Sequence, residues 1–206
     1  MSENNESQWL SRIDRLAAEH YLVVDNAITD QQINSLLSYL QMEMENEELA
    51  IAGIGLDADI EKSVRGDYIK WVEEQTHESL SPFFNQVNHW IDQLNRWCFL
   101  GISGYEFHLA YYPEGTFYKR HLDQFQERNN RLISCVFYLN PEWKEGDGGE
   151  LKLFLEGKEE IVHPVGGRMI IFKSDVLPHE VLMTNKPRYS LTGWFLKQPP
   201  GLGFLA

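Results

Sequence analysis

The chain has 206 residues, of which 43% are hydrophobic, enough to bury one substantial core and better suited to one domain than to two. Its formal charge of −13, with no basic stripe, argues against binding nucleic acid through phosphate neutralisation. The N-terminal residues have no basic start and no apolar run, and no stretch approaches the roughly 18 apolar residues of a membrane span, so we expect a cytoplasmic protein that does not contact membranes.

Helical spacing of apolar residues dominates the chain up to residue 103. Apolar side chains recur every three or four positions from Trp9 to Ala17, from Ile33 to Leu40 and from Phe84 to Leu94. A capping-box pattern from Thr29 to Gln32 precedes the second run, and Ser81-Pro82 precedes the third. We therefore predict three helices.

Two segments between these helices carry unusual patterns. Residues 55–62, GLDADIEK, resemble the start of a calcium loop but lack its later Gly and Glu, so we expect an acidic surface loop. Residues 63–74, SVRGDYIKWVEE, hold an Arg-Gly-Asp triplet followed by alternating aromatic and charged side chains. The triplet suggests adhesion, but such short matches arise often by chance.

Residues 104–198 change to a strand pattern. Short runs rich in aromatic and β-branched residues are separated by Gly, Pro and Asn turns: YEFHLAYYP, RLISCVFYLN, ELKLFLE, RMIIFK and RYSLTGWFLK. We predict an α+β fold in which helices support one face of an antiparallel β-sandwich or jelly roll, whose open end could hold a small ligand.

A candidate metal site lies in YYPEGTFYKRHLDQF, residues 111–125. His121 and Asp123 are two positions apart, so on a strand both side chains point to the same face. His179, in SDVLPHEVL, could supply a third ligand. Two imidazoles and one carboxylate on one side of a ferrous ion leave the other positions open, as in non-haem iron oxygenases. His-x-Asp alone also occurs on exposed edge strands.

Arg188 follows His179 by nine residues, a spacing that can carry the chain round a turn and back as the neighbouring strand. Period two then places Arg188, Ser190, Thr192 and Trp194 on one face. A buried Arg needs an anion, and the distal carboxylate of a dicarboxylate co-substrate could provide it. An exposed Arg paired with a neighbouring acid is the alternative.

In this order, His121-x-Asp123, His179 and Arg188 resemble the Fe(II)- and 2-oxoglutarate-dependent oxygenases. The segments CVFYLNPEW, GGELKLF, DVLPHEV and RYSLTGWF are similar to the catalytic domain of the HIF-type prolyl hydroxylases, and most of all to the small bacterial members of that group. These enzymes are dioxygenases of the procollagen-proline type. The resemblance spans about residues 60 to 196. It implies a double-stranded β-helix (jelly roll) core buttressed by N-terminal helices, and trans-4-hydroxylation of a proline in a protein substrate.

The resemblance also implies roles for particular residues. The iron ligands would be His121, Asp123 and His179. The site for 2-oxoglutarate would include Arg188 and Tyr138 at the distal carboxylate, pocket-lining residues Thr192 and Trp194, and Tyr112 near the iron, although Tyr111 is adjacent and this loop is one residue shorter than in the animal enzymes. Arg131 matches an Arg near the mouth of the active site.

Residues 63–74 resemble the segment that folds over the active-site mouth of these hydroxylases and grips the peptide. Gly66 would permit a tight turn between two short strands. Arg65 and Asp67 would hydrogen-bond the peptide, and Ile69 and Trp71 would pack against the barrel. This interpretation predicts that the peptide substrate, and not the iron, contacts Asp67.

We therefore expect one 2-oxoglutarate oxygenase domain over residues 1–206: mainly helical support with the substrate loop 63–74 over residues 1–103, and a jelly-roll catalytic core over residues 104–198. Fe(II), 2-oxoglutarate, O2 and, as an optional reductant, ascorbate are the expected cofactors and co-substrates. Elongation factor Tu is a candidate protein substrate by resemblance alone. Hydroxylation of another protein or a free amino acid, and a non-catalytic jelly-roll binding module, are the alternatives. We favour a core position for His108 over one near the site.

Overall fold

The computed structural model describes residues 3–53, 61, 63–124 and 130–198. The acidic segment 55–62 therefore lies, except for Glu61, outside the described residues. No helix in the described part of the chain is long and apolar enough to cross a membrane.

The three predicted helices are confirmed: α1 (Glu3–Glu19), α2 (Asp30–Glu45) and α3 (Ser81–Cys98), with a short 3-10 helix η1 (Glu78–Leu80) before α3. The capping box at the start of α2 is present, because the Gln32 amide donates to the Thr29 hydroxyl and the Gln32 side chain accepts from the Thr29 amide at 2.8 Å. Pro82 lies in the first turn of α3, where the amide hydrogen it lacks would have no helical partner.

Two antiparallel sheets follow the predicted strand pattern. The seven-stranded sheet has the order β1-β9-β6-β11-β4-β3-β2, and the four-stranded sheet has the order β5-β10-β7-β8. The first sheet contains β1 (Tyr21–Val24), β2 (Ala50–Ile51), β3 (Tyr68–Val72), β4 (Gly104–Tyr112), β6 (Arg131–Tyr138), β9 (Met169–Lys173) and β11 (Arg188–Leu196). The second contains β5 (Tyr118–His121), β7 (Leu151–Leu155), β8 (Lys158–Val162) and β10 (His179–Val181).

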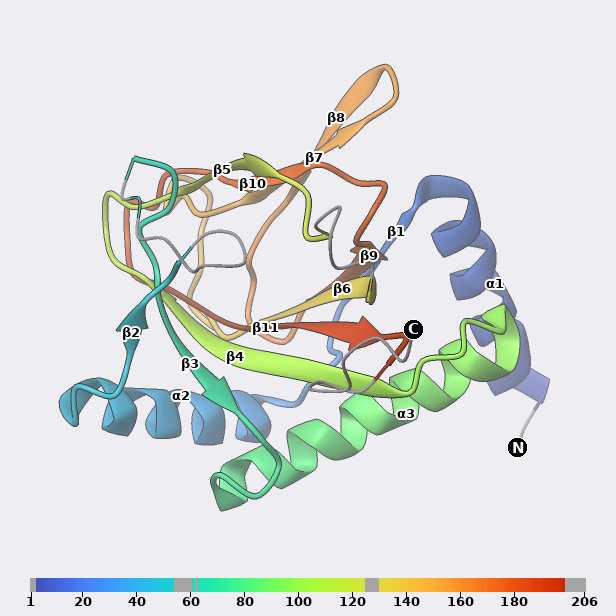
Figure 1. The fold of residues 1–206 in the computed structure, drawn as a ribbon, viewed down its shortest axis with the longest axis horizontal. Helices are drawn as coiled ribbons and strands as arrows, with labels where there is room; N and C mark the ends of the chain where they lie inside the picture. The colour runs from blue at the N-terminus through green and yellow to red at the C-terminus, as the bar shows by residue number, and fades with distance from the viewer. Residues whose placement is uncertain (1–2, 54–60, 62, 125–129, 199–206) are drawn as a thin grey trace, which may run out of the picture.

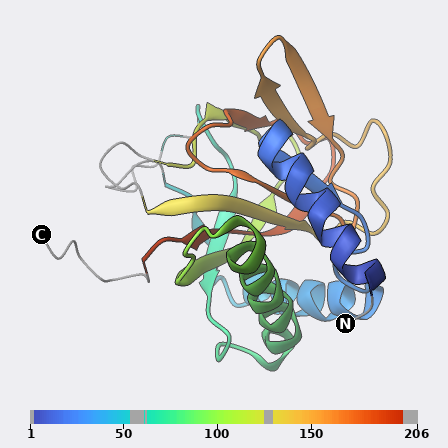
Figure 2. The ribbon, with the colours of Figure 1, turned by 90° about the vertical axis from the view of Figure 1, so that its right-hand side faces the viewer.

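The layers stack as helices, large sheet and small sheet (Figure 1). Helices α2 and α3 lie along one face of the seven-stranded sheet, and the four-stranded sheet faces its other side. Helix α1 crosses near β1, as the turned view shows (Figure 2). This arrangement agrees with the predicted α+β jelly roll supported by N-terminal helices.

Side-chain alternation on the large sheet divides its two faces. On β4, Phe107 and Leu109 belong to the core shared with the helices, whereas Ala110 and Tyr112 belong to the core between the sheets. On β11, Leu191 likewise faces the helices. Alternate residues on these strands therefore pack against the helices, and the residues between them face the space between the two sheets, where a site could lie.

The strands add to the predicted pattern at one point and contradict it at another. Residues 1–103 supply three strands of the large sheet, β1, β2 and β3, which are too short for their periodicity to stand out. His179 and Arg188 do not lie on neighbouring strands, because β10 belongs to the four-stranded sheet and β11 to the seven-stranded one. The turn between them carries the chain from one sheet to the other, and both side chains line the cavity between the sheets.

Candidate metal centre and co-substrate pocket

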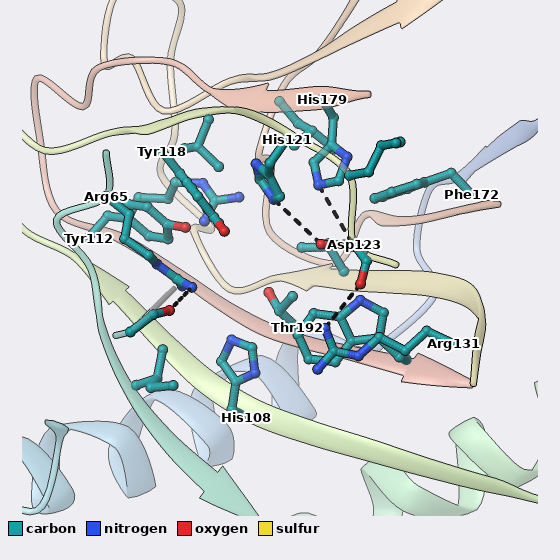
Figure 3. Close-up of a pocket in the computed structure, with 18 of the residues that line it drawn as sticks. Arg65, His108, Tyr112, Tyr118, His121, Asp123, Arg131, Phe172, His179 and Thr192 are labelled. Atoms are coloured by element: carbon teal, nitrogen blue, oxygen red, sulfur yellow. Dashed lines mark hydrogen bonds and ion pairs between the residues drawn. The ribbon is translucent and has the colours of Figure 1, made fainter. Parts of the chain in front are cut away.

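Three potential metal ligands meet at the four-stranded sheet (Figure 3). His121 ends β5, His179 begins β10, and the two residues are directly opposite each other in the antiparallel register. Asp123 follows β5 in a bend. One ligand atom from each residue lies within 4.8 Å of the others, and Nε2 of His121 and of His179 lie 3.4 and 3.6 Å from the Asp123 carboxylate oxygens. The predicted triad is therefore assembled.

Hydrogen bonds behind the triad orient its ligand atoms. Nδ1 of His121 donates to the Lys119 carbonyl oxygen at 2.8 Å, and Nδ1 of His179 donates to that of Leu177 at 3.1 Å. Because a carbonyl oxygen can only accept, each neutral ring keeps the lone pair of its Nε2 free for a cation.

The Asp123 carboxylate is also held from behind. It accepts a 2.6 Å hydrogen bond from the Ser134 hydroxyl, which is 2.9 Å from the Ser174 hydroxyl. This buried pair of hydroxyls restricts how the carboxylate can turn.

The protonation states suit a divalent cation. Burial would raise the pKa of Asp123, but the imidazoles of His179 and His121 and the Ser134 hydroxyl outweigh it and hold that pKa well below its usual value. Burial lowers the pKa of His179 to about 4, opposed by Asp123. At neutral pH the carboxylate is charged and this imidazole is neutral, which is the state that binds a metal. Two imidazole nitrogens and one carboxylate on one side fit a ferrous ion.

The triad opens into a cavity of about 200 Å³ between the two sheets. Its far wall includes Arg188, whose side chain is only 3% exposed and pairs with no carboxylate of the described residues. The guanidinium donates to the Gly149 carbonyl at 2.9 Å and to the Ser190 hydroxyl at 3.3 Å. A buried cation without a counter-ion requires an anionic ligand.

Two tyrosines lie beside this guanidinium. Its central carbon is 4.9 Å from the Tyr112 ring centre and 5.2 Å from that of Tyr138. The Tyr138 hydroxyl is fully buried, and its charged neighbour is the Arg188 guanidinium. A carboxylate bound at Arg188 could accept from this hydroxyl, so the residues fit the distal carboxylate of 2-oxoglutarate.

Other predicted site residues also line the cavity: Tyr112, Thr192, Trp194, Arg131, Arg65 and Trp71. Tyr111, the alternative to Tyr112, instead stacks on Tyr189 at 5.4 Å. Arg131 forms an ion pair with Glu106 at 2.7 Å, and its guanidinium lies 3.5 Å from the Trp194 ring centre.

The structure places the Arg-Gly-Asp segment differently from the sequence-based expectation. Asp67 is fully buried, and both its carboxylate oxygens accept hydrogen bonds from Arg65 at 2.7 and 2.6 Å. It therefore offers no surface to a peptide. Gly66 does not sit in a turn between two strands; a Cβ there would lie 2.9 Å from the Thr116 side chain, so close approach is what requires glycine.

Backbone contacts tie this segment to the small sheet. Lys119 donates its amide hydrogen to the Val64 carbonyl at 2.9 Å, and Gly66 donates to that of Phe117 at 3.1 Å. The following residues then form β3 in the large sheet. The segment thus joins the two sheets along one side of the cavity.

Among the residues that line the cavity, sequence reasoning missed two with polar side chains. Tyr118 stacks on His121 at 3.6 Å, and the Arg65 guanidinium lies 4.3 Å from its ring centre. His108, for which we favoured a core position, lines the cavity. The alternation of side chains along a strand would have predicted this position for His108. Tyr112 was expected at the site, and His108 is four positions earlier on the same strand, so both side chains point to the same face.

Comparison with known proteins supports this interpretation. The family model of the 2OG-Fe(II) oxygenase superfamily matches residues 107–196. A Pseudomonas putida prolyl-4-hydroxylase of known structure is 34% identical, with a TM-score of 0.83, and the match covers 92% of this chain and 99% of that one. The chain belongs to the 2OG-Fe(II) oxygenase superfamily. Within that superfamily, this oxygenase is of the prolyl hydroxylase type.

Two animal relatives agree with this family assignment. Egl nine homolog 1 of Homo sapiens is 33% identical over 151 residues, which are 67% of this chain and 34% of that protein; the chain thus corresponds to about a third of that relative's length. A Trichoplax adhaerens prolyl hydroxylase, solved with a peptide fragment of the hypoxia inducible factor oxygen degradation domain, is 25% identical with a TM-score of 0.87, and the match covers 95% of this chain and 91% of that one. The predicted resemblance to 2-oxoglutarate oxygenases of the prolyl hydroxylase type is confirmed, and its assignment to the bacterial branch stays a prediction.

Proposed function

We propose that this oxygenase is a peptidyl-prolyl 4-hydroxylase of the bacterial branch, which uses Fe(II), 2-oxoglutarate and O2 to hydroxylate a proline in a protein substrate. The observation that carries the proposal is one cavity that contains both a three-ligand metal site and a buried, uncompensated Arg188. A non-catalytic binding module would have no need of both.

In this proposal, His121, Asp123 and His179 hold the iron. When bound, Fe(II) and 2-oxoglutarate together supply the oxidising chemistry that uses O2 to hydroxylate a C–H bond and releases succinate and carbon dioxide. The protein fixes the positions of the reactants and limits the access of water.

Arg188 and Tyr138 would anchor the distal carboxylate of 2-oxoglutarate, with Thr192 on the same wall. The guanidinium provides parallel donors and the phenol a third one. Burial raises the pKa of Tyr138, so its hydroxyl keeps the proton that it would donate. Tyr112 keeps its proton for the same reason, and would face the metal-chelating end of the co-substrate.

Residues at the cavity entrance would receive the peptide. Trp71 is 52% exposed, and Arg131 and Trp194 lie beside it on the same wall. Arg65 would act on the peptide from the side of the small sheet, while Asp67 holds Arg65 in place. Elongation factor Tu is the substrate that we propose, and ascorbate would serve as an external reductant.

The experiment is hydroxylation of purified elongation factor Tu by the oxygenase with Fe(II), 2-oxoglutarate, O2 and ascorbate, followed by peptide mass spectrometry. We expect one added oxygen on a proline with the wild-type protein and none with His179→Ala. His163→Ala, which removes an exposed histidine that does not line the cavity, should behave as wild type.

The same mass spectrometry on whole cells with and without the oxygenase separates two failures. An added oxygen on a proline of another protein would replace elongation factor Tu as the substrate. Succinate release stimulated by a free amino acid, with no prolyl modification in any protein, would refute the peptidyl-prolyl assignment and favour the alternative oxygenase function.

A further inference from the structure

His108 is a polar side chain in the cavity wall that the mechanism above does not use. It lies in the middle of β4, paired in register with Thr192 on one side and Trp71 on the other. The residue is only 4% exposed, and its Nδ1 atom is buried without a hydrogen-bond partner among the described residues. A buried imidazole nitrogen without a partner destabilises the folded protein, so a bound ligand is a natural source of the missing hydrogen bond.

The imidazole of His108 is neutral at physiological pH. Burial lowers its pKa to about 3, and the positive charge of Arg65 lowers it further, while Asp67 opposes this effect. A neutral imidazole has one N–H donor and one acceptor nitrogen. It therefore suits a neutral ligand group that can donate or accept, such as an amide, better than it suits a carboxylate.

Two tryptophans flank this imidazole on the large-sheet side of the cavity. Ring centres are 5.0 Å apart for Trp71 and His108, and 5.5 Å apart for His108 and Trp194. The Trp194 indole nitrogen is a second buried polar atom with no partner among the described residues. Flat aromatic faces beside unsatisfied polar atoms suit an apolar ring attached to an amide.

His108 is offset from the proposed carboxylate anchor Arg188: in the β4–β11 register Arg188 pairs with Tyr112, four positions from His108, and the pocket-lining residue that pairs with His108 is Thr192. The triad comes from the small sheet and its adjoining bend, whereas His108 stands on the large sheet (Figure 3). On that sheet His108 pairs with Trp71, which is half-exposed. The carboxylate anchors Arg188 and Tyr138 lie at other positions of that sheet. A ligand that enters past Trp71 therefore meets His108.

We infer that His108 is a substrate-positioning residue whose Nδ1 hydrogen-bonds a main-chain amide next to the target proline, while Trp71 and Trp194 contact the prolyl ring. This inference rests on the proposed prolyl hydroxylase function. It adds a requirement to that function: the peptide is held by its main chain at the proline, and a free amino acid lacks the amide that His108 would bind.

The test compares wild type, His108→Leu and His108→Asn. Leucine has a similar volume without a polar atom, and asparagine restores a polar atom near the place of Nδ1. The probe is the blocked dipeptide N-acetyl-Pro-Gly-amide, added to Mn(II)-loaded protein with 2-oxoglutarate and without oxygen. Broadening of the proline proton resonances by Mn(II) reports binding next to the metal, and no turnover is needed.

We expect His108→Leu to weaken dipeptide binding about tenfold and His108→Asn by no more than about threefold, since one hydrogen bond is lost or largely kept. The affinity for 2-oxoglutarate should stay the same in all three proteins. Equal dipeptide binding in wild type and His108→Leu would overturn the inference, as would an equal loss of 2-oxoglutarate affinity, which would place His108 at the co-substrate.

Thermal melting without ligand checks that the leucine variant folds. Replacing an unsatisfied buried polar atom should leave Tm unchanged or raise it by about 2–4 °C. A clear fall in Tm would mean that the imidazole has a structural partner and would overturn the inference. The inference would also be overturned if the wild-type protein bound Mn(II) but did not broaden the proline resonances of the dipeptide. The proposed hydroxylation of a protein proline is tested separately, by mass spectrometry of the protein substrate.

Discussion

The ion pair between Arg65 and Asp67 offers a direct test of what the Arg-Gly-Asp segment does. Side-chain exposures are 12% for Arg65 and 0% for Asp67, and the guanidinium meets the carboxylate through two short hydrogen bonds. Asp67→Ala would leave a buried, unpaired guanidinium. Breaking a buried pair from one side costs about 3–5 kcal/mol, a large part of the roughly 5–15 kcal/mol that stabilises a typical protein.

Urea unfolding followed by tryptophan fluorescence measures this cost. With a slope of about 2 kcal/mol per molar, the midpoint of Asp67→Ala should fall by roughly 2 M. The matched control is Asp25→Ala, which removes a carboxylate that is 64% exposed and 2.7 Å from Arg168. Exposed pairs contribute about 0–1 kcal/mol, so this variant should unfold close to wild type.

Activity provides the second measurement for Asp67→Ala. Arg65 lies against Tyr118, and Tyr118 stacks on His121, so displacement of Arg65 should disturb the metal site as well as the entrance. We expect succinate release without peptide and prolyl hydroxylation with peptide to fall together. If Asp67→Ala unfolds like Asp25→Ala and loses only prolyl hydroxylation, the buried-pair reasoning is wrong and Asp67 contacts the peptide after all.

Three further predictions concern the cavity. His179→Ala should lose Fe(II) binding, measured by metal analysis after gel filtration, while the exposed control His163→Ala retains it. Arg188→Lys should weaken 2-oxoglutarate binding about tenfold to a hundredfold without changing Fe(II) binding, because an ammonium cannot replace a two-donor fork; equal co-substrate constants would contradict this. Burial lowers the pKa of His108 from 6.5 in the unfolded chain to about 3 in the folded protein. The unfolded chain therefore takes up a proton at His108 as the pH falls from 6.5 towards 3, and the free energy of unfolding decreases over this range. In urea titrations, lowering the pH from 7 to 5 should reduce the free energy of unfolding of His108→Leu by about 2 kcal/mol less than that of wild type. Identical reductions in the two proteins would refute the lowered pKa of His108.

Local sequence patterns were sufficient to predict the long elements of the fold. Helix α2 has an apolar stripe and a capping box, and β4 and β11 each span nine residues with a clear period of two. In these elements the local preference and the tertiary packing agree. The short strands β1, β2, β5 and β10 have two to four residues, so their pairing depends on distant partners that the local pattern does not specify.

Site residues could be predicted where a charged or metal-binding side chain stood in a strand pattern that is otherwise apolar. A buried Arg without a partner and a His-x-Asp pair both indicate a ligand, and the structure brings Arg188, His121 and Asp123 to one cavity. The same reasoning failed for Asp67, because an exposed loop was assumed and the nearby Arg65 is itself the partner. Nothing in the spacing of the triplet distinguishes a residue that contacts substrate from one that holds its neighbour.

The division of the large sheet explains how the site tolerates unsatisfied polar atoms. One face packs aromatic and aliphatic side chains such as Phe107, Phe137 and Phe195 against the helices, and these residues are almost fully buried. The other face carries His108 and Trp194, whose Nδ1 and indole nitrogen atoms have no partner among the described residues. Each unsatisfied buried atom lowers the stability of the folded protein by about 1–3 kcal/mol. Burial of apolar side chains on the helix-facing side can offset this cost. The two faces share a backbone but not side-chain contacts. Polar cavity positions therefore remain available for binding, and substitutions on the helix-facing side should change stability far more than ligand affinity.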